Sequence, residues 1–160
     1  LRFGAASVVA ELVLRTGSET GDPRLFDRVE RALDALEHAA ADRLDAVALA
    51  EIWGIVAELG FAPALDNCLA CGRPLADDED TLFDYESGGV RCRDCAPTGG
   101  GRTLPADARR TLRALVRGRA MPLERTAALW SLLTRFLAHH VLEGATIRSL
   151  QFLAEAREPR

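Results

Sequence analysis

The sequence contains no lysine, so each of its 20 basic residues is an arginine. Together with the many alanines, this absence indicates a GC-rich genome rather than a mechanism. Long apolar runs are lacking too. No window approaches the eighteen or more apolar residues of a membrane span, so we expect no membrane partner. The net charge of −4 also argues against a nucleic-acid surface that covers the whole chain.

Recognisable catalytic motifs are missing. The sequence has no G-x-S-x-G, no phosphate-binding loop, no dinucleotide fingerprint and no H-E-x-x-H. The acidic run from Asp77 to Asp80 is typical of a solvated hairpin face rather than of a catalytic carboxylate pair. We therefore expect that the protein is not an enzyme.

The histidines and tryptophans lie in helical patterns. His139 and His140 are neighbours, and neighbours on a helix point about 100° apart, so both rings cannot easily reach one ion. We interpret them, and His38, as core or surface side chains. Trp53 and Trp130 lie among apolar residues at helical spacing, which indicates core positions rather than platforms for stacked bases.

Four cysteines, the only ones in the chain, form two C-x-x-C pairs separated by twenty residues: Cys68, Cys71, Cys92 and Cys95. Such pairs can close a tetrahedron of thiolates around one zinc ion. The alternatives are two disulfides, or four buried thiols without metal. A disulfide within C-x-x-C is strained or redox-active, so zinc is the favoured interpretation. Four cysteines leave no vertex open for water, so the site would be structural.

Two short β-prone runs, Thr81–Tyr85 and Gly89–Arg91, lie between the cysteine pairs and lead directly into the second pair. Gly72 suits the positive φ with which the first turn would end. The pattern predicts a zinc ribbon over residues 67–98, inserted between helical parts at residues 1–66 and 99–160.

The remaining sequence has helical periodicity. We expect the second helix to be capped by Asp22, with Pro23 in its first turn and Phe26, Val29, Leu33 and Leu36 in one apolar stripe. Gly60 would end the third helix. The predicted helices cover residues 5–15, 22–38, 42–59, 105–118, 123–142 and 149–156. The fold class is therefore an all-α bundle with an inserted small β-hairpin.

A cluster of arginines stands out because almost no acidic residues accompany it. The candidates for binding nucleic acid or an acidic peptide are Arg91, Arg93, Arg109, Arg110, Arg113 and Arg117. Such a local positive field can neutralise phosphates, and planar guanidinium groups can also grip carboxylates. The alternative is that these side chains pair with acidic residues of the second and third helices. The sequence alone leaves these possibilities open.

The order of these features resembles one known family. The segment from Leu59 to Gly72 is similar to the one that opens the zinc-bearing insert of RecO recombination mediators, and Phe83–Cys95 is similar to the one that closes it. Further similarity lies in Glu11-Leu12, in Leu25-Phe26 and in Ile147–Leu153. The resemblance covers essentially the whole chain.

The resemblance implies a non-enzymatic bacterial DNA repair protein of the cytoplasm and nucleoid. Family members anneal single-stranded DNA and, with RecR and the single-stranded-DNA-binding protein, load recombinase on gaps. Their helical domain receives the acidic, hydrophobic C-terminal tail of the single-stranded-DNA-binding protein. They also carry an N-terminal OB-fold, which this sequence does not show before Leu1, so we expect a C-terminal part. The alternative function is a zinc-ribbon scaffold or regulatory domain that binds only protein partners.

Overall fold

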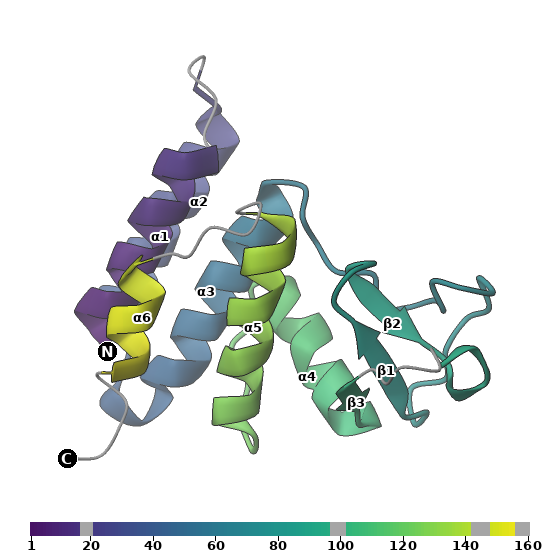
Figure 1. Ribbon diagram of the computed structural model, residues 1–160. Coiled ribbons are helices and arrows are strands. Elements are labelled where there is room, and N and C mark those ends of the chain that lie inside the picture. Colours follow the sequence, from purple (N-terminus) through teal and green to yellow (C-terminus); the bar gives the residue numbers. More distant parts are fainter. Residues whose placement is uncertain (17–20, 97–101, 142–147, 156–160) are drawn as a thin grey trace.

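The structure is a computed structural model that describes residues 1–16, 21–96, 102–141 and 148–155. Figure 1 shows a helical body with a small sheet at one end. Helices α1, α2 and α6 lie together at the other end, and α3, α4 and α5 lie between them and the sheet. The described helices are α1 (Arg2–Thr16), α2 (Pro23–His38), α3 (Leu44–Glu58), α4 (Ala106–Val116), α5 (Thr126–His140) and α6 (Arg148–Glu155), with 3-10 turns η1 (Ala41–Arg43) and η2 (Arg93–Cys95).

The six helices that the periodicity predicts are confirmed, with ends that shift by a few residues. Helix α1 begins earlier than expected, and the predicted ends at Leu142 and Ala156 lie outside the described residues. None of the described helices is both long and apolar enough to cross a membrane.

Helix α2 begins as its sequence predicts. Asp22 has an extended backbone, its side chain accepts a hydrogen bond from the N–H of Arg24 at 2.9 Å, and Pro23 takes the first helical position. At the end of α3, Gly60 has a φ of +88°, as expected for a glycine that stops a helix. Local chemistry therefore determines both boundaries.

The apolar stripe expected on α2 is partly wrong. Phe26 and Leu33 are 63% and 41% exposed, whereas Leu25, Ala32 and Leu36 are buried. The buried positions are spaced by seven and four residues and form one face, while Phe26 and Leu33 each lie one residue further around the helix. Because α2 packs against both α1 and α3, these two neighbours select the buried face.

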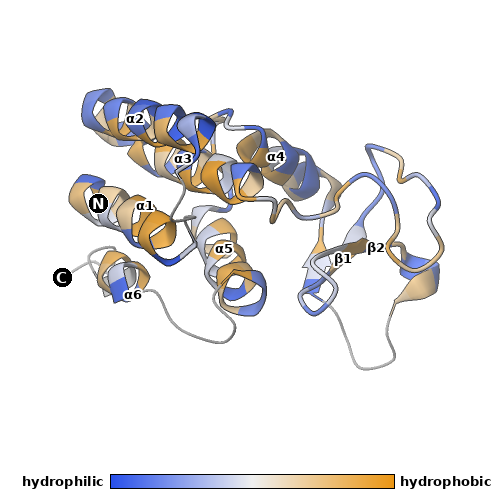
Figure 2. Cartoon of the chain, turned by 90° about the horizontal axis from the view of Figure 1, so that it is seen from above, coloured by the Kyte–Doolittle hydropathy of each residue, from blue (hydrophilic) through white to orange (hydrophobic). Residues whose placement is uncertain are grey.

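The core is centred on α3. Its residues Leu49, Ile52, Trp53, Ile55 and Val56 are fully buried, and the helix contacts α1, α2, α4 and α5. A helix that is apolar around most of its circumference is one that other elements surround. Figure 2 shows this difference, because α3 is coloured mostly as hydrophobic and α2 is largely hydrophilic.

The sheet has three antiparallel strands in the order β2-β1-β3, namely β1 (Thr81–Asp84), β2 (Gly89–Arg91) and β3 (Arg102–Leu104). Phe83 on β1 lies opposite Val90 on β2 and opposite Arg102 on β3. The hairpin of β1 and β2 confirms the expectation from the sequence. Strand β3 was not predicted, because it lies outside the segment between the two cysteine pairs and pairs with β1 about twenty residues earlier in the chain.

Aromatic side chains join the sheet to the helical body. The ring of Phe136 on α5 lies 5.1 Å from that of Trp53 and 6.3 Å from that of Phe83, measured between ring centres. Phe83 in turn contacts Tyr85 edge-on at 5.0 Å. The sheet therefore shares one apolar core with α3 and α5, which fixes the cysteine-bearing loops relative to the helices.

Candidate metal centre and the arginines around it

The first cysteine pair lies on a tight hairpin, residues 66–75, which we call the first cysteine loop. The N–H of Cys68 donates to the carbonyl of Arg73 at 2.9 Å, and the N–H of Leu75 donates to the carbonyl of Asp66 at 3.0 Å. Gly72 turns the chain with a φ of +74°, as predicted, a conformation that disfavours side chains with a Cβ. These bonds hold Cys68 and Cys71 on one side of the turn.

The second pair follows β2 directly. Cys92 comes after the last residue of that strand, and η2 then brings Cys95 back toward it, with the N–H of Cys95 donating to the carbonyl of Cys92 at 3.1 Å. The N–H of Leu69 donates to the carbonyl of Val90 at 2.9 Å, which attaches the first cysteine loop to β2. The sheet therefore brings the two pairs together.

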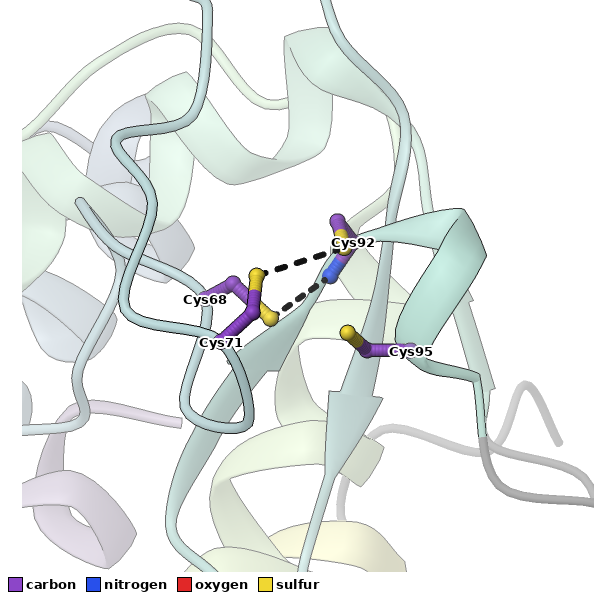
Figure 3. A group of neighbouring side chains, drawn as sticks. All are labelled: Cys68, Cys71, Cys92 and Cys95. Carbon is purple, nitrogen blue, oxygen red and sulfur yellow. Dashed lines mark hydrogen bonds between the residues drawn. The ribbon is translucent and has the colours of Figure 1, made fainter.

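The four sulfur atoms lie within 4.8 Å of one another, and the Sγ atoms of Cys71 and Cys92 are 3.9 Å apart (Figure 3). A tetrahedron with Zn–S bonds of about 2.3 Å has S···S edges of about 3.8 Å. The sulfurs of Cys68 and Cys92 belong to buried residues, whereas Cys71 is exposed and Cys95 half-buried. Both the spacing and the all-sulfur donor set fit a metal ion that prefers thiolates, so these four residues can hold one.

Hydrogen bonds already favour a thiolate at Cys68. Burial acts to raise the pKa of this thiol, but N–H groups of Cys71, Cys92 and Ala70 donate to the sulfur and lower its pKa to about 6. The N–H of Cys92 lies 3.3 Å from that sulfur. The pKa of Cys95 is raised to about 12. Hydrogen bonds with the thiols of Cys92 and Cys71 contribute most, and loss of hydration and the neighbouring Cys68 add to them. The surroundings therefore favour a thiolate at Cys68 and a protonated thiol at Cys95.

Among the described residues, no other group of histidines, cysteines and carboxylates gathers in this way. His140 bonds the carbonyl of Tyr85 through Nε2 and stacks on Phe136 at 4.7 Å, while His139 is exposed. His38 is exposed at the end of α2. The histidines are core or surface residues, as expected, and both tryptophans are buried.

The candidate arginines do not form one uniform face. Arg91 pairs with Asp84 on the hairpin, and Arg93 pairs with Asp80 at 2.9 Å. On α4, Arg113 lies 2.8 Å from both Asp66 and Asp77. Their partners therefore come from the first cysteine loop, from the acidic run that follows it and from β1, not from the second and third helices.

The other three candidates differ in exposure. Arg110 is exposed and donates to the carbonyl of Asp77 at 2.8 Å, and Arg117 is exposed directly after the end of α4. Arg109 is 0% exposed, which differs from the exposed face expected for it. The acidic run is largely solvated, as expected, with Asp77 and Asp78 exposed, while Asp77, Glu79 and Asp80 each contact an arginine.

The sequence analysis missed Arg73, which follows the first cysteine pair directly. Its guanidinium pairs with Glu79, and the Glu79 carboxylate and the Cys92 sulfur raise the pKa of Arg73 above its usual value. Its position next to Gly72 was the available signal, because a cation beside a C-x-x-C-G turn can stabilise thiolates.

A groove of about 300 Å³ lies between α4 and α5, away from the cysteines. Arg110 and Arg125 line it together with Asp107 and Glu124, and Met121, Pro122 and Leu129 supply apolar lining. Arg125 lies 3.4 Å from Asp107. The groove therefore combines apolar surface with charged groups of both signs.

Comparison with known proteins gives a consistent result. Residues 1–151 match the family model described as recombination protein O C terminal. A DNA repair protein RecO of Anaeromyxobacter dehalogenans is 37% identical over 96% of this chain and 62% of its own length. That of Rubrobacter xylanophilus is 31% identical over 90% of this chain and 58% of its own length. The chain thus spans about three fifths of the length of these relatives.

Proposed function

Since this chain belongs to the recombination protein O family of DNA repair proteins, we propose that it serves as a non-enzymatic mediator of DNA repair and recombination. In this role it binds and anneals single-stranded DNA and helps RecR and the single-stranded-DNA-binding protein to load recombinase. It acts in the bacterial cytoplasm at the nucleoid. The observation that carries the proposal is the family match over residues 1–151.

The metal of the proposed site is zinc, one ion per chain, bound by Cys68, Cys71, Cys92 and Cys95. With four protein ligands its role is structural, because no position remains for water or substrate. The cysteines occur on short loops that bury few apolar side chains, so metal binding supplies the energy that holds them together. The predicted zinc-ribbon insert between the two helical parts spans residues 67–98, of which 97 and 98 lie outside the described residues.

Single-stranded DNA is proposed to contact the exposed arginines beside the ribbon. Arg93, Arg110 and Arg117 of the predicted set are exposed, and exposed ion pairs such as that of Arg93 exchange partners at little cost. Arg119 is exposed next to Arg117 and extends the same basic segment. Phosphate contacts of this kind give binding that weakens steeply with salt.

The tail of the single-stranded-DNA-binding protein is proposed to enter the groove between α4 and α5. The tail is acidic and ends in a phenylalanine, and in the groove Arg110 and Arg125 lie next to Met121 and Leu129, with Asp107 and Glu124 on the same lining. The pair of Arg125 with Asp107 is exposed, so Arg125 can exchange it for a carboxylate of the tail at little cost. A peptide with carboxylates and one apolar end fits both features. An Arg125→Glu variant should lose affinity for such a peptide, and unchanged affinity would exclude this groove.

The DNA proposal is tested by fluorescence anisotropy with labelled single strands. Charge reversal at Arg117 and Arg119 should weaken binding and lower the salt slope by about 0.7 for each lost phosphate contact. Arg24→Glu, an exposed arginine on α2 at the far end, is the matched control and should bind as the unchanged chain does. Peptide binding without any DNA binding at low salt would instead favour the scaffold that binds only protein partners.

A further inference from the structure

Arg109 on α4 is the one charged side chain that is fully buried in the part of the chain that the structure describes. Removing a charge from water is costly unless hydrogen bonds or opposite charges compensate for it. The burial of this guanidinium therefore points to a specific role for its contacts.

The contacts of Arg109 lie on the two strands of chain that enter and leave the first cysteine loop, which we call its arms. Its Nη1 donates to the carbonyl of Leu65 at 3.3 Å, and its Nη2 donates to the carbonyl of Ala76. In the loop, Asp66 pairs with Leu75 through a backbone hydrogen bond. Leu65 and Ala76 are the next residues outward from that pair, so the guanidinium takes the place of the next rung of the hairpin.

This rung matters for the cysteines because the loop is short. Counting inward from Arg109, the pairs are Asp66 with Leu75, Asn67 with Pro74, and Cys68 with Arg73. Spreading of the base at Leu65 and Ala76 would shift Cys68 and Cys71 relative to the second pair.

The charges around Arg109 come from α4 and from the loop. Burial, and then the nearby Arg113, lower the pKa of Arg109, while Asp77, Glu79 and Asp66 act in the opposite direction. Since the usual pKa of arginine is above 12, the side chain stays protonated at neutral pH. Arg113 also joins both arms, but through Asp66 and Asp77 side chains that are 66% and 73% exposed, and exposed ion pairs hold such geometry weakly.

We propose that Arg109 is a positioning residue of the metal centre, which joins the two arms of the first cysteine loop and so sets Cys68 and Cys71 at the spacing that a tetrahedral ion requires. The inference rests on the proposed binding of zinc by the four cysteines. Groups that orient metal ligands without touching the metal typically change metal affinity by about 10–100-fold when they are replaced.

The test compares zinc affinity with helical stability in three variants of the chain. Zinc dissociation constants are measured by competition with the chelator 4-(2-pyridylazo)resorcinol, and helix unfolding is followed by circular dichroism. Arg109→Met removes both donors and should raise the zinc dissociation constant by about 10–100-fold. Arg109→Lys keeps the charge but loses the planar fork, so it should give an intermediate value and covers the case in which the methionine variant does not fold.

Arg28→Met is the matched control, because Arg28 is another largely buried arginine but pairs with Glu51 between α2 and α3. It should lower the temperature of helix unfolding and leave zinc affinity unchanged. Equal loss of zinc affinity in Arg28→Met and Arg109→Met would show a general effect of stability and overturn the inference. Wild-type affinity in Arg109→Met, or in Arg109→Lys, would overturn it too. A wild-type chain that binds no zinc would overturn the metal centre itself, together with this inference.

Discussion

Helix α3 and the first cysteine loop are held in place by opposite means. Ten of the fifteen residues of α3 are buried, including Trp53, and neighbouring helices surround it. In residues 66–75 only Cys68 and Leu75 are buried, and the loop is fixed by backbone hydrogen bonds and by arginines of α4. The hydrophobic effect therefore maintains the helical body, whereas the loop depends on polar contacts and on its sulfurs.

The comparison predicts that the two regions respond to different changes. Loss of metal should disorder the loops and leave the helices, and loss of apolar contacts should destabilise the helices first. The aromatic contacts of Phe136 with Trp53 and Phe83 join α3 to the sheet on which the cysteine loops are held.

The largest effect is expected from Cys92→Ser. Removing one thiolate should reduce bound zinc from about one ion per chain to nearly none, because metal binding supplies on the order of 10–16 kcal/mol of folding free energy in isolated zinc fingers. Amide hydrogen exchange should then be fast over residues 66–75 and 92–96, while helical circular dichroism remains. Full retention of zinc would contradict the assignment of Cys92 as a ligand.

A second change attacks the helical body. Leu49 is fully buried in α3, so Leu49→Ala should lower the free energy of unfolding by about 2–5 kcal/mol, measured by urea denaturation. Zinc content at low urea should stay unchanged. If Leu49→Ala lost zinc but kept the wild-type free energy of unfolding, the comparison would be contradicted, because the apolar core would then hold the metal site and not the helices.

A smaller effect is expected at the start of α2. Asp22→Ala removes the acceptor for the N–H of Arg24 and should cost about 0.5–2 kcal/mol in the same assay. Asp27→Ala, an exposed position on the same helix, is the control and should cost less. An equal cost for both variants would mean that Asp22 does not act as a cap.

The smallest effect concerns pH and the contact of α1 with α6. Burial raises the pKa of Glu11, but hydrogen bonds from Ser149 and Arg148, together with Arg15, lower it below 4.5 overall. A depressed pKa contributes stability above 4.5 that is lost as pH falls through the lower, folded value. The protection factors of the α6 amides, which correct for the intrinsic exchange rate at each pH, should therefore fall in acid. Glu11→Gln should remove this pH dependence, and a variant with the same dependence would assign it elsewhere.

Local features of the fold were predictable from the sequence. The cap at Asp22, the positive φ at Gly60 and Gly72 and the approach of the four sulfurs each follow from residue types at short spacing. The non-local features were not predictable. Strand β3 exists only because β1 pairs with it, and burial of Arg109 depends on carbonyls 44 and 33 residues away.

The same distinction explains the arginine cluster. The order of residues showed that arginines gather near α4. Whether an arginine contacts a phosphate, a carboxylate or a carbonyl depends on which loop packs beside it. Asp66 in the first cysteine loop and Asp77 just after it both reach Arg113, and no pattern within α4 encodes that approach.

The most direct test of the metal centre is X-ray absorption at the zinc edge on the purified chain. We expect a zinc signal with four sulfur neighbours at about 2.3 Å and no oxygen or nitrogen neighbour. A chain without zinc, or an ion with a ligand other than sulfur, would contradict the closed four-cysteine site.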